Sequence, residues 1–319
     1  MSLTADDILD RAHVVALPMV VPFRGITTRE ALLIEGPAGW GEFAPFVEYG
    51  DAEAATWLKA GLEAAFTGYA DVDTGDGWVE VNGTVPAVSP DEVPGVLARY
   101  PSARTFKIKV AEKGQTLIDD AARVAAVRAA RPDAVLRVDA NGGWSVDEAV
   151  RAAETLGELE YIEQPCATVE ELAQVRRRVA TPIAADESIR KAADPYRVAE
   201  LAAADVAVAK VAPLGGVRRL MQISSDLGLR LTVASALDTA VGIRAGLIAA
   251  KATHSQAAGL ATQRLFAEDV AGPFEFVGGR MRIADAVPDP DRLVGLAAPG
   301  ERKDWWFERL RRCLTYLGD

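Results

Sequence analysis

Cysteine and histidine are scarce in this 319-residue sequence, and their scarcity excludes several kinds of site. The two cysteines, Cys166 and Cys313, lie far apart and have no metal-ligand spacing, so neither a disulfide framework nor a zinc site is indicated. The two histidines, His13 and His254, have no partner pattern, and we interpret both as structural or surface residues. A reducing compartment is the simpler inference from this cysteine usage.

Long hydrophobic runs and leader segments are also missing. No run of eighteen apolar residues occurs, because the apolar segment 201–214 is interrupted by Asp205 and Lys210. The first ten residues, MSLTADDILD, are acidic and lack the basic start and apolar stretch of a signal peptide. The sequence therefore predicts a cytoplasmic protein without a membrane partner.

Basic residues are outnumbered, since 35 Lys and Arg stand against 46 Asp and Glu, which gives a net charge of −11. This balance argues against a general nucleic-acid or anionic-membrane surface, whereas a few local cations can still hold a small-molecule carboxylate. The length, with 50% hydrophobic residues, suffices for a large domain and a smaller one with a well-buried core. The sequence does not indicate an oligomeric state.

No phosphate-binding glycine fingerprint follows the first strand of the central region, which argues against a doubly wound open sheet. Instead, apolar runs alternate with Ala-rich helical patterns from residue 79 to 265, as is typical of parallel strands joined by helices. Eight such runs predict a closed α/β barrel, and they span 79–87, 105–110, 134–140, 159–165, 181–188, 206–212, 229–235 and 259–265. We expect residues 1–78 and 266–319 to form one α+β domain, because neither end alone holds much core.

Charged residues recur at the ends of four successive predicted strands. Asp139, Glu163, Asp186 and Lys210 are separated by 24, 23 and 24 residues, one strand–helix unit each. A lone acid at a strand end is more often a helix cap or a loop charge, but three acids at one register meet at the face where barrel enzymes build their sites. Converging carboxylates repel each other unless a cation lies among them. Oxygen ligands favour a hard divalent ion, and so predict Mg²⁺ first and Mn²⁺ second.

Two lysines, Lys107 and Lys109, share one face of the apolar segment TFKIKV. In an isolated strand they would form an exposed polar face. Beside the three acids, and with Lys210 on the far side, they indicate a different role, because a neighbouring ammonium and a metal ion lower the pKa of a lysine toward that of a general base. Base, metal and opposing cation together describe proton abstraction from the carbon next to a carboxylate.

The motifs KIK, DANGGW, EQP, DES and VAKVAPLGG resemble the enolase superfamily in its muconate-lactonizing subgroup, and within it the o-succinylbenzoate synthases of actinobacterial type. GWGEFAPF near the N-terminus and SALDTAVGI at the seventh strand extend the resemblance over most of the chain. The resemblance implies an α/β fold, a modified TIM barrel of (β/α)₇β type, covered by an α+β capping domain that both chain ends form.

The resemblance also implies roles for the charged residues. In that family the second lysine of the K-x-K pair is the general base, here Lys109, and the lysine that ends the sixth strand, here Lys210, stabilises the enediolate by its charge. Lys107 would help to bind the substrate carboxylate or tune its neighbour. The metal ligands correspond to the three strand-end acids, Asp139, Glu163 and Asp186. The implied reaction is the loss of water from 2-succinyl-6-hydroxy-2,4-cyclohexadiene-1-carboxylate to give 2-succinylbenzoate, a hydro-lyase step of menaquinone biosynthesis.

Arg24 and Ser235 are further candidates for contact with the substrate. Arg24 lies in a segment where the capping domain of this family closes over the barrel, and Ser235 ends the seventh predicted strand, where a structural role for its hydroxyl is an equal alternative. Glu187 is expected to face away from Asp186 on a strand and to support the barrel wall. Asn141 either orients the acid before it or shapes its turn.

Other interpretations remain open from the sequence. Gly215 and Gly216 either allow close backbone approach near a ligand or form an ordinary turn. N-acylamino acid racemases and dipeptide epimerases use the same metal triad and the same two lysines, and the barrel motifs do not separate them from the dehydratase. A metal-independent Schiff-base enzyme acting through Lys210 would leave the three acids unexplained. A non-catalytic binding protein would tolerate arginine in place of the lysines.

Overall fold

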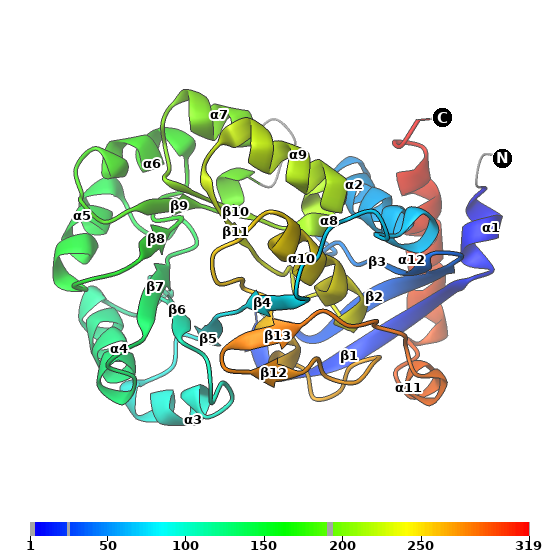
Figure 1. Ribbon diagram of the computed structural model, residues 1–319, viewed down its shortest axis with the longest axis horizontal. Coiled ribbons are helices and arrows are strands. Elements are labelled where there is room, and N and C mark those ends of the chain that lie inside the picture. The colour runs from blue at the N-terminus through cyan, green and yellow to red at the C-terminus, as the bar shows by residue number, and fades with distance from the viewer. Residues whose placement is uncertain (1–3, 24–25, 190–193, 319) are drawn as a thin grey trace.

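The structure is a computed structural model that describes residues 4–23, 26–189 and 194–318. Two bodies lie side by side in Figure 1: a ring of parallel strands surrounded by helices, and a smaller body of antiparallel strands and helices from both chain ends. The fold is therefore the predicted modified (β/α)₇β barrel with an α+β capping domain. The bounds set for the two domains, 1–78 with 266–319 and 79–265, stay a prediction.

The capping domain is built on a three-stranded antiparallel sheet in which β2 pairs with both neighbours. Its strands are β1 (Ala12–Phe23), β2 (Ile26–Gly36) and β3 (Gly39–Phe43). Its helices are α1 (Ala5–Leu9), α2 (Asp51–Leu62), the π-helical turn η1 (Glu63–Thr67), α11 (Pro290–Gly295) and α12 (Gly300–Leu314). Helix α12 packs against α2 and α1, and the fully buried Trp306 meets Phe43 of the sheet edge-on at 5.7 Å. The C-terminal helix thus completes the core of the N-terminal module.

Seven parallel strands form the barrel sheet, in the order β11-β10-β9-β8-β7-β6-β5. They are β5 (Gly83–Val85), β6 (Thr105–Lys109), β7 (Val135–Asp139), β8 (Tyr161–Glu163), β9 (Ile183–Ala185), β10 (Val206–Ala209) and β11 (Arg230–Val233). Alternate side chains of each strand face opposite ways: Phe106 and Ile108 of β6 are fully buried in the main core, whereas Lys107 and Lys109 face the interior of the barrel.

Helices follow the strands and surround the barrel (Figure 1). They are η2 (Pro90–Glu92), α3 (Val93–Leu97), α4 (Leu117–Ala130), α5 (Val146–Thr155), α6 (Val169–Arg176), η3 (Glu187–Ile189), α7 (Asp194–Glu200), α8 (Val211–Leu214), α9 (Val217–Leu227) and α10 (Ala240–Ala252). Among the described α-helices of this set, three begin with a capping box, in which a hydroxyl and an acid three residues later each accept from the other's backbone N–H. These pairs are Thr116 with Asp119, Ser145 with Glu148, and Thr168 with Glu171.

The eighth predicted strand, 259–265, is wrong for most of its length, because residues Ala261–Leu265 form a 3₁₀ turn, η4. The barrel is closed just before this turn. Ala258 exchanges backbone hydrogen bonds with the segment before β5, and Gly259 does so with the end of β11. The chain then bends over the barrel mouth, where the Thr262 hydroxyl donates to Ser235 Oγ at 2.8 Å.

The first predicted barrel strand, 79–87, divides between two sheets. Its beginning, β4 (Trp78–Glu80), pairs with β13 (Arg280–Arg282) and thus belongs to a separate small sheet with β12 (Phe276–Val277). Only the later part, β5, lies in the barrel. The C-terminal segment therefore contacts the barrel as well as the capping domain.

Two glutamates of the capping domain dock onto the N-termini of barrel helices. Glu63 accepts hydrogen bonds from the backbone N–H groups of Val217 and Arg218, at 2.6 and 3.2 Å, in the first turn of α9. A Cβ at Gly216 would lie 2.1 Å from Glu63 Oε2, so this glycine makes room for the glutamate of the capping domain rather than for a ligand. The negative carboxylate is favourable there because helix N-termini carry partial positive charge.

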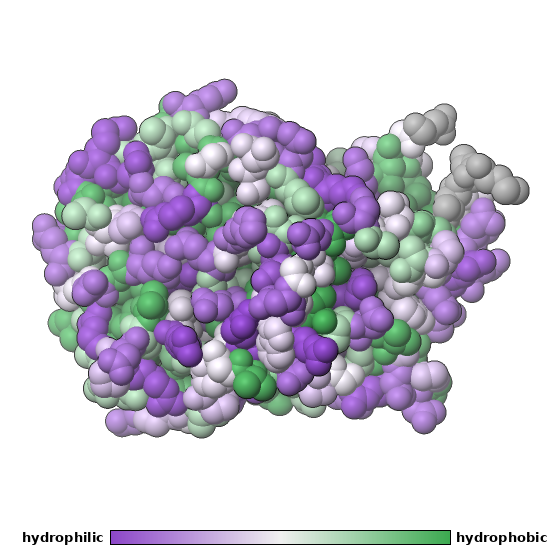
Figure 2. All heavy atoms as spheres, in the orientation of Figure 1, coloured by the Kyte–Doolittle hydropathy of each residue, from purple (hydrophilic) through white to green (hydrophobic). Residues whose placement is uncertain are grey.

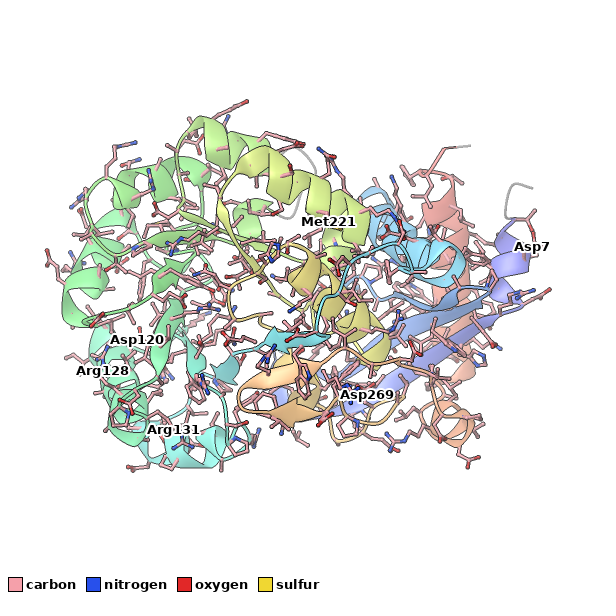
Figure 3. The ribbon with its side chains drawn as sticks, viewed as in Figure 1. Asp7, Asp120, Arg128, Arg131, Met221 and Asp269 are labelled. Atoms are coloured by element: carbon pink, nitrogen blue, oxygen red, sulfur yellow. The ribbon has the colours of Figure 1, made fainter. Side chains whose placement is uncertain are left out.

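Glu42 acts in the same way on α10. It accepts from the backbone N–H groups of Thr239 and Gly242, each at 3.0 Å, and from the Thr239 hydroxyl at 2.6 Å. Asp269, labelled in Figure 3, adds a third anchor by accepting from Ala240 N at 3.0 Å. The capping domain is therefore held to the barrel at the two helices that follow β10 and β11.

The outer surface is largely hydrophilic on the face seen in Figure 2, with hydrophobic residues interspersed over the barrel helices and the capping domain. Among the residues that the structure describes, no helix has both the length and the apolar composition needed to cross a membrane.

We predict that Glu63→Ala lowers the free energy of unfolding by about 1–2 kcal/mol, because α9 loses the acceptor for its first N–H groups. Chemical denaturation measures this loss. Glu63→Gln is the matched control, since it keeps the shape and one acceptor oxygen and is expected to lose less. Equal stability of Glu63→Ala and the parent protein would show that the contact holds nothing in place.

Candidate active site

Strand register brings three of the predicted site residues to one level inside the barrel. Lys109 of β6 is directly opposite Asp139 of β7, and Asp139 is opposite Glu163 of β8. Residues paired in this way on parallel strands point to the same face of the sheet. The three side chains therefore leave the carboxyl ends of adjacent strands together, as the spacing of the sequence predicts.

Two further predicted site residues follow the next two strands. Asp186 comes directly after β9, and Lys210 comes directly after β10 as the residue before α8. The Lys210 ammonium donates to both oxygens of the Asp186 carboxylate. Lys109 and Lys210 are thus carried on β6 and β10, and the three strands between them carry the three acids.

Ion pairs join the lysines to the acids throughout this cluster. Lys107 Nζ lies 2.7 Å from Glu163 Oε1 and 3.2 Å from Asp139 Oδ2. Lys109 Nζ lies 2.6 Å from the same Asp139 oxygen. The side chains of the acids are at most 4% exposed and those of the three lysines 11–16% exposed, so the ammonium groups lie between buried carboxylates and the solvent-facing pocket.

This arrangement shifts the pKa values of the buried groups in opposite directions. Burial alone would lower the pKa of Lys107, but Glu163 and Asp139 outweigh burial and hold that pKa well above its usual value. Burial would raise the pKa of Asp139, yet the ammonium groups of Lys109 and Lys107 hold it far below its usual range. Burial and the nearby Asp139 carboxylate raise the pKa of Glu163 to about 8. Glu163 is therefore the acid of the three whose negative charge the surrounding lysines balance least.

Asn141 contacts both the charged cluster and Glu187, an acid whose position differs from the one predicted from the sequence. Its backbone N–H donates to Asp139 Oδ1 at 3.0 Å, and its side-chain oxygen accepts from Lys109 Nζ at 2.6 Å. Its amide nitrogen donates to Glu187 Oε1 at 3.1 Å. Asn141 therefore contacts Asp139 through its backbone N–H, and its φ of 45° shows that it also shapes the turn. The prediction that Glu187 lies on a strand and supports the barrel wall is wrong, because it begins the turn η3 and contacts Asn141.

A hollow of about 680 Å³, partly open to solvent, contains the charged cluster. Barrel residues form one side of it, and three aromatic residues of the capping domain, Phe46, Tyr49 and Trp57, form another. This aromatic wall was not predicted from the sequence. Its signal is the run EFAPFVEYG, where aromatic residues recur every third position around a proline.

The two predicted substrate-binding residues have different outcomes. Ser235 lines the hollow, and its oxygen accepts from Leu237 N at 2.9 Å, from Asp238 N at 3.2 Å and from the Thr262 hydroxyl. Its hydroxyl is also within hydrogen-bond reach of the Asp238 carboxylate, and donation to a ligand stays a prediction. Arg24 lies outside the described residues.

The donor set fits a hard divalent cation. Glu163 Oε2 is buried and has no hydrogen-bond partner among the described residues, which is costly for a carboxylate oxygen. All three acids offer oxygen, the ligand atom that such cations prefer. Within the described residues, no three acids lie close enough to hold a metal as they stand, since ammonium groups contact the same oxygens. A cation and the lysines would therefore compete for these carboxylates.

Family comparisons agree with this geometry. An enolase C-terminal domain-like family matches residues 96–290, and an enolase N-terminal domain-like family matches residues 14–65. An o-succinylbenzoate synthase of Mycolicibacterium smegmatis is 60% identical over 313 residues, which cover 97% of this chain and 96% of the relative. The o-succinylbenzoate synthase of Mycobacterium marinum is 56% identical over 319 residues, with 98% and 96% covered.

Solved structures share the fold at low identity. The muconate lactonizing enzyme from Pseudomonas putida matches with a TM-score of 0.74 at 21% identity, over 90% of this chain and 98% of that one. An N-succinyl Arg/Lys racemase from Bacillus cereus matches with a TM-score of 0.77 at 18% identity, over 90% and 96%. The strong likeness to the mycobacterial proteins carries the assignment: the chain belongs to the enolase superfamily and, within it, to the o-succinylbenzoate synthase family.

Proposed function

We propose that the protein is a hydro-lyase that removes water from 2-succinyl-6-hydroxy-2,4-cyclohexadiene-1-carboxylate to form 2-succinylbenzoate in menaquinone biosynthesis. The relatives that share 56–60% of its residues over nearly the whole chain are named for this product. One observation about the site carries the mechanism: two lysines enter the hollow from β6 and β10, and the three strands between them bear the acids. A flat substrate held against the acids would thus have a lysine on each side.

Lys109 is the base in this proposal. Its nitrogen takes the proton from the carbon next to the substrate carboxylate, and the electrons of that C–H bond move toward the carboxylate to form an enediolate. Lys109, now protonated, gives a proton to the departing hydroxyl on the same face, the C–O bond breaks, and water leaves as the ring becomes aromatic. Lys210 keeps its positive charge on the other face and stabilises the enediolate.

A divalent ion belongs to the same proposal. Members of this superfamily generally bind a divalent metal ion. Here the acids Asp139, Glu163 and Asp186 would hold Mg²⁺, with Mn²⁺ as the second choice. When bound, the ion supplies positive charge against the substrate carboxylate as it gains electron density. A cation that binds Asp139 would take over the oxygen to which the Lys109 nitrogen now donates.

Lys107 contacts Glu163 and Asp139 directly, and we assign it to the charge balance of the site and to holding the substrate carboxylate. Ser235 is proposed to donate its hydroxyl proton to the succinyl group. Of the other functions, racemisation or epimerisation is not favoured, because the high-identity relatives are named as synthases and the racemases match in fold alone. A Schiff-base role of Lys210 alone would leave the three acids beside it without a function.

The partner that we infer is a small-molecule carboxylate, and the compartment is the cytoplasm. The chain has 35 basic and 46 acidic residues, and this excess of acidic residues supports a single local cationic site rather than a nucleic-acid or membrane surface. The three lysines of the hollow are where this local positive charge gathers.

Lys109→Ala is expected to lower kcat for the cyclohexadiene substrate by about 10³-fold, because the base is gone. Lys109→Arg should lose as much, since a guanidinium keeps the charge but does not take up a proton at working pH. Lys210→Arg keeps the charge that its role requires and is expected to lose no more than about tenfold. Ultraviolet absorbance of the aromatic product measures each rate. Near-normal turnover by Lys109→Ala would refute the proposed base.

Removal of divalent ions by a chelator is expected to abolish turnover, and added Mg²⁺ to restore it. Glu163→Gln should weaken Mn²⁺ binding at least tenfold, as measured by the electron paramagnetic resonance signal of free Mn²⁺, because a charged ligand is lost. Asp205→Asn is the matched control: this acid lies at the opposite end of β10 and pairs with Arg176. If Glu163→Gln and Asp205→Asn bound Mn²⁺ equally well, the metal would have to lie elsewhere.

A further inference from the structure

Two arginines are buried in the molecule without a carboxylate in contact. Arg29 of β2 is 3% exposed and Arg309 of α12 is 1% exposed. In the part of the chain that the structure describes, neither guanidinium forms a salt bridge with an acid, and the hydrogen bonds of both go to backbone carbonyls. A buried cation is costly to retain. Because the two arginines are retained despite this cost, the groups that they contact indicate what they hold in place.

The carbonyls that they bind belong to the walls of the hollow. Arg309 donates to Pro45 O at 3.3 Å, to Phe46 O at 3.0 Å and to Tyr49 O at 2.7 Å. These residues form the turn that carries two of the three aromatic side chains in the wall. Arg309 thus holds the capping-domain wall from behind, through a helix near the C-terminus.

Arg29 connects that wall to the opposite one. Its guanidinium donates to Ala44 O at the start of the capping-domain turn, and lies 4.4 Å from the centroid of the Phe46 ring. It also donates to Leu237 O at 3.1 Å and to Ala236 O at 3.3 Å. Ala236 and Leu237 line the hollow in the loop after β11. One side chain therefore fixes the distance between the two walls.

The barrel loop needs such support because of its backbone conformation. Leu237 has a φ of 61°, in the left-handed region that is sterically unfavourable for a residue with a Cβ. Its N–H is held by Ser235 Oγ and its carbonyl by Arg29. Without the guanidinium, the loop would lose the contact that fixes this conformation on the carbonyl side.

We propose that Arg29 and Arg309 are positioning residues that set the apolar wall of the hollow, and through it the recognition of the uncharged part of the substrate. This rests on the proposed function for the identity of the substrate, but not for the positioning itself. The chemistry near the lysines is carried on other strands, so the expected effect is on binding.

The test compares Arg29→Met and Arg309→Met with Arg292→Met. Arg292 is the matched control, because its guanidinium also donates to two backbone carbonyls, Asp269 O and Ala271 O, which do not line the hollow. We expect KM for the cyclohexadiene substrate to rise about tenfold in the first two variants, while kcat stays within about threefold of the parent value. This pattern is the one expected when a mutation removes binding energy that the ground state and the transition state share. Arg292→Met should keep the parent KM even where its melting temperature falls.

Hydrogen exchange measured by mass spectrometry without substrate tests whether the two arginines hold the walls of the hollow in place, independently of the enzyme's function. Amides in peptides that cover 44–49 and 236–242 should exchange faster in Arg29→Met, and those of 44–49 in Arg309→Met, while β6 to β8 keep the parent rates. If KM and exchange in these peptides match those of Arg292→Met, the proposal is overturned. A parent protein that does not turn over the substrate would refute the proposed function, and exchange would still decide the positioning.

The lysine variants cover the case in which a methionine variant does not fold. Arg29→Lys and Arg309→Lys keep the charge but not the planar set of donors, so each reaches fewer of the three carbonyls. They are expected to fold and to raise KM less than the methionine variants, with faster exchange in the same peptides. Parent-like KM and exchange in both lysine variants would also overturn the proposal.

Discussion

The mutual neutralisation of three acids and three lysines at the barrel mouth is the interaction on which the site depends. Buried carboxylates on adjacent strands would repel one another strongly without opposite charges among them. Lys107 and Lys109 supply those charges from β6 on one side, and Lys210 supplies one from the end of β10 on the other. The same contacts hold Lys109, the base of the proposed mechanism, against an acid, so in that mechanism stability of the free site and readiness for chemistry are opposed. A substrate and a divalent ion would resolve that opposition by taking over these contacts.

Polar contacts hold the capping domain in place at the mouth of the barrel. Glu42 and Glu63 place carboxylates on the N-termini of α10 and α9, which follow the strands that end near Ser235 and Lys210. Helix dipole and N–H donors make each contact directional as well as favourable. The capping domain is thereby aligned with the two loops that complete the hollow, and its aromatic turn falls opposite the charged wall.

The charged half of the site is predictable from sequence because it follows from a repeat. One strand–helix unit of 23 or 24 residues carries each residue to the same end of the next strand, so Asp139, Glu163 and Asp186 needed only the barrel assumption. The eighth strand was predicted too late in the chain because its barrel pairing occupies just Ala258 and Gly259, too short to give an alternating pattern. Local propensity likewise could not place Glu187 in a turn.

The apolar half of the hollow is not visible in any local pattern, because it is made by contacts between distant parts of the chain. Arg309 reaches the carbonyl of Tyr49 across 260 residues, and Arg29 reaches Leu237 across 208. The sequence separation of such contacts follows no regular pattern. A buried arginine also cannot be told from a surface arginine by its sequence context. The charged cluster thus follows from the periodic barrel, whereas the apolar wall of the hollow depends on contacts that the two chain ends make with each other and with the loop after β11.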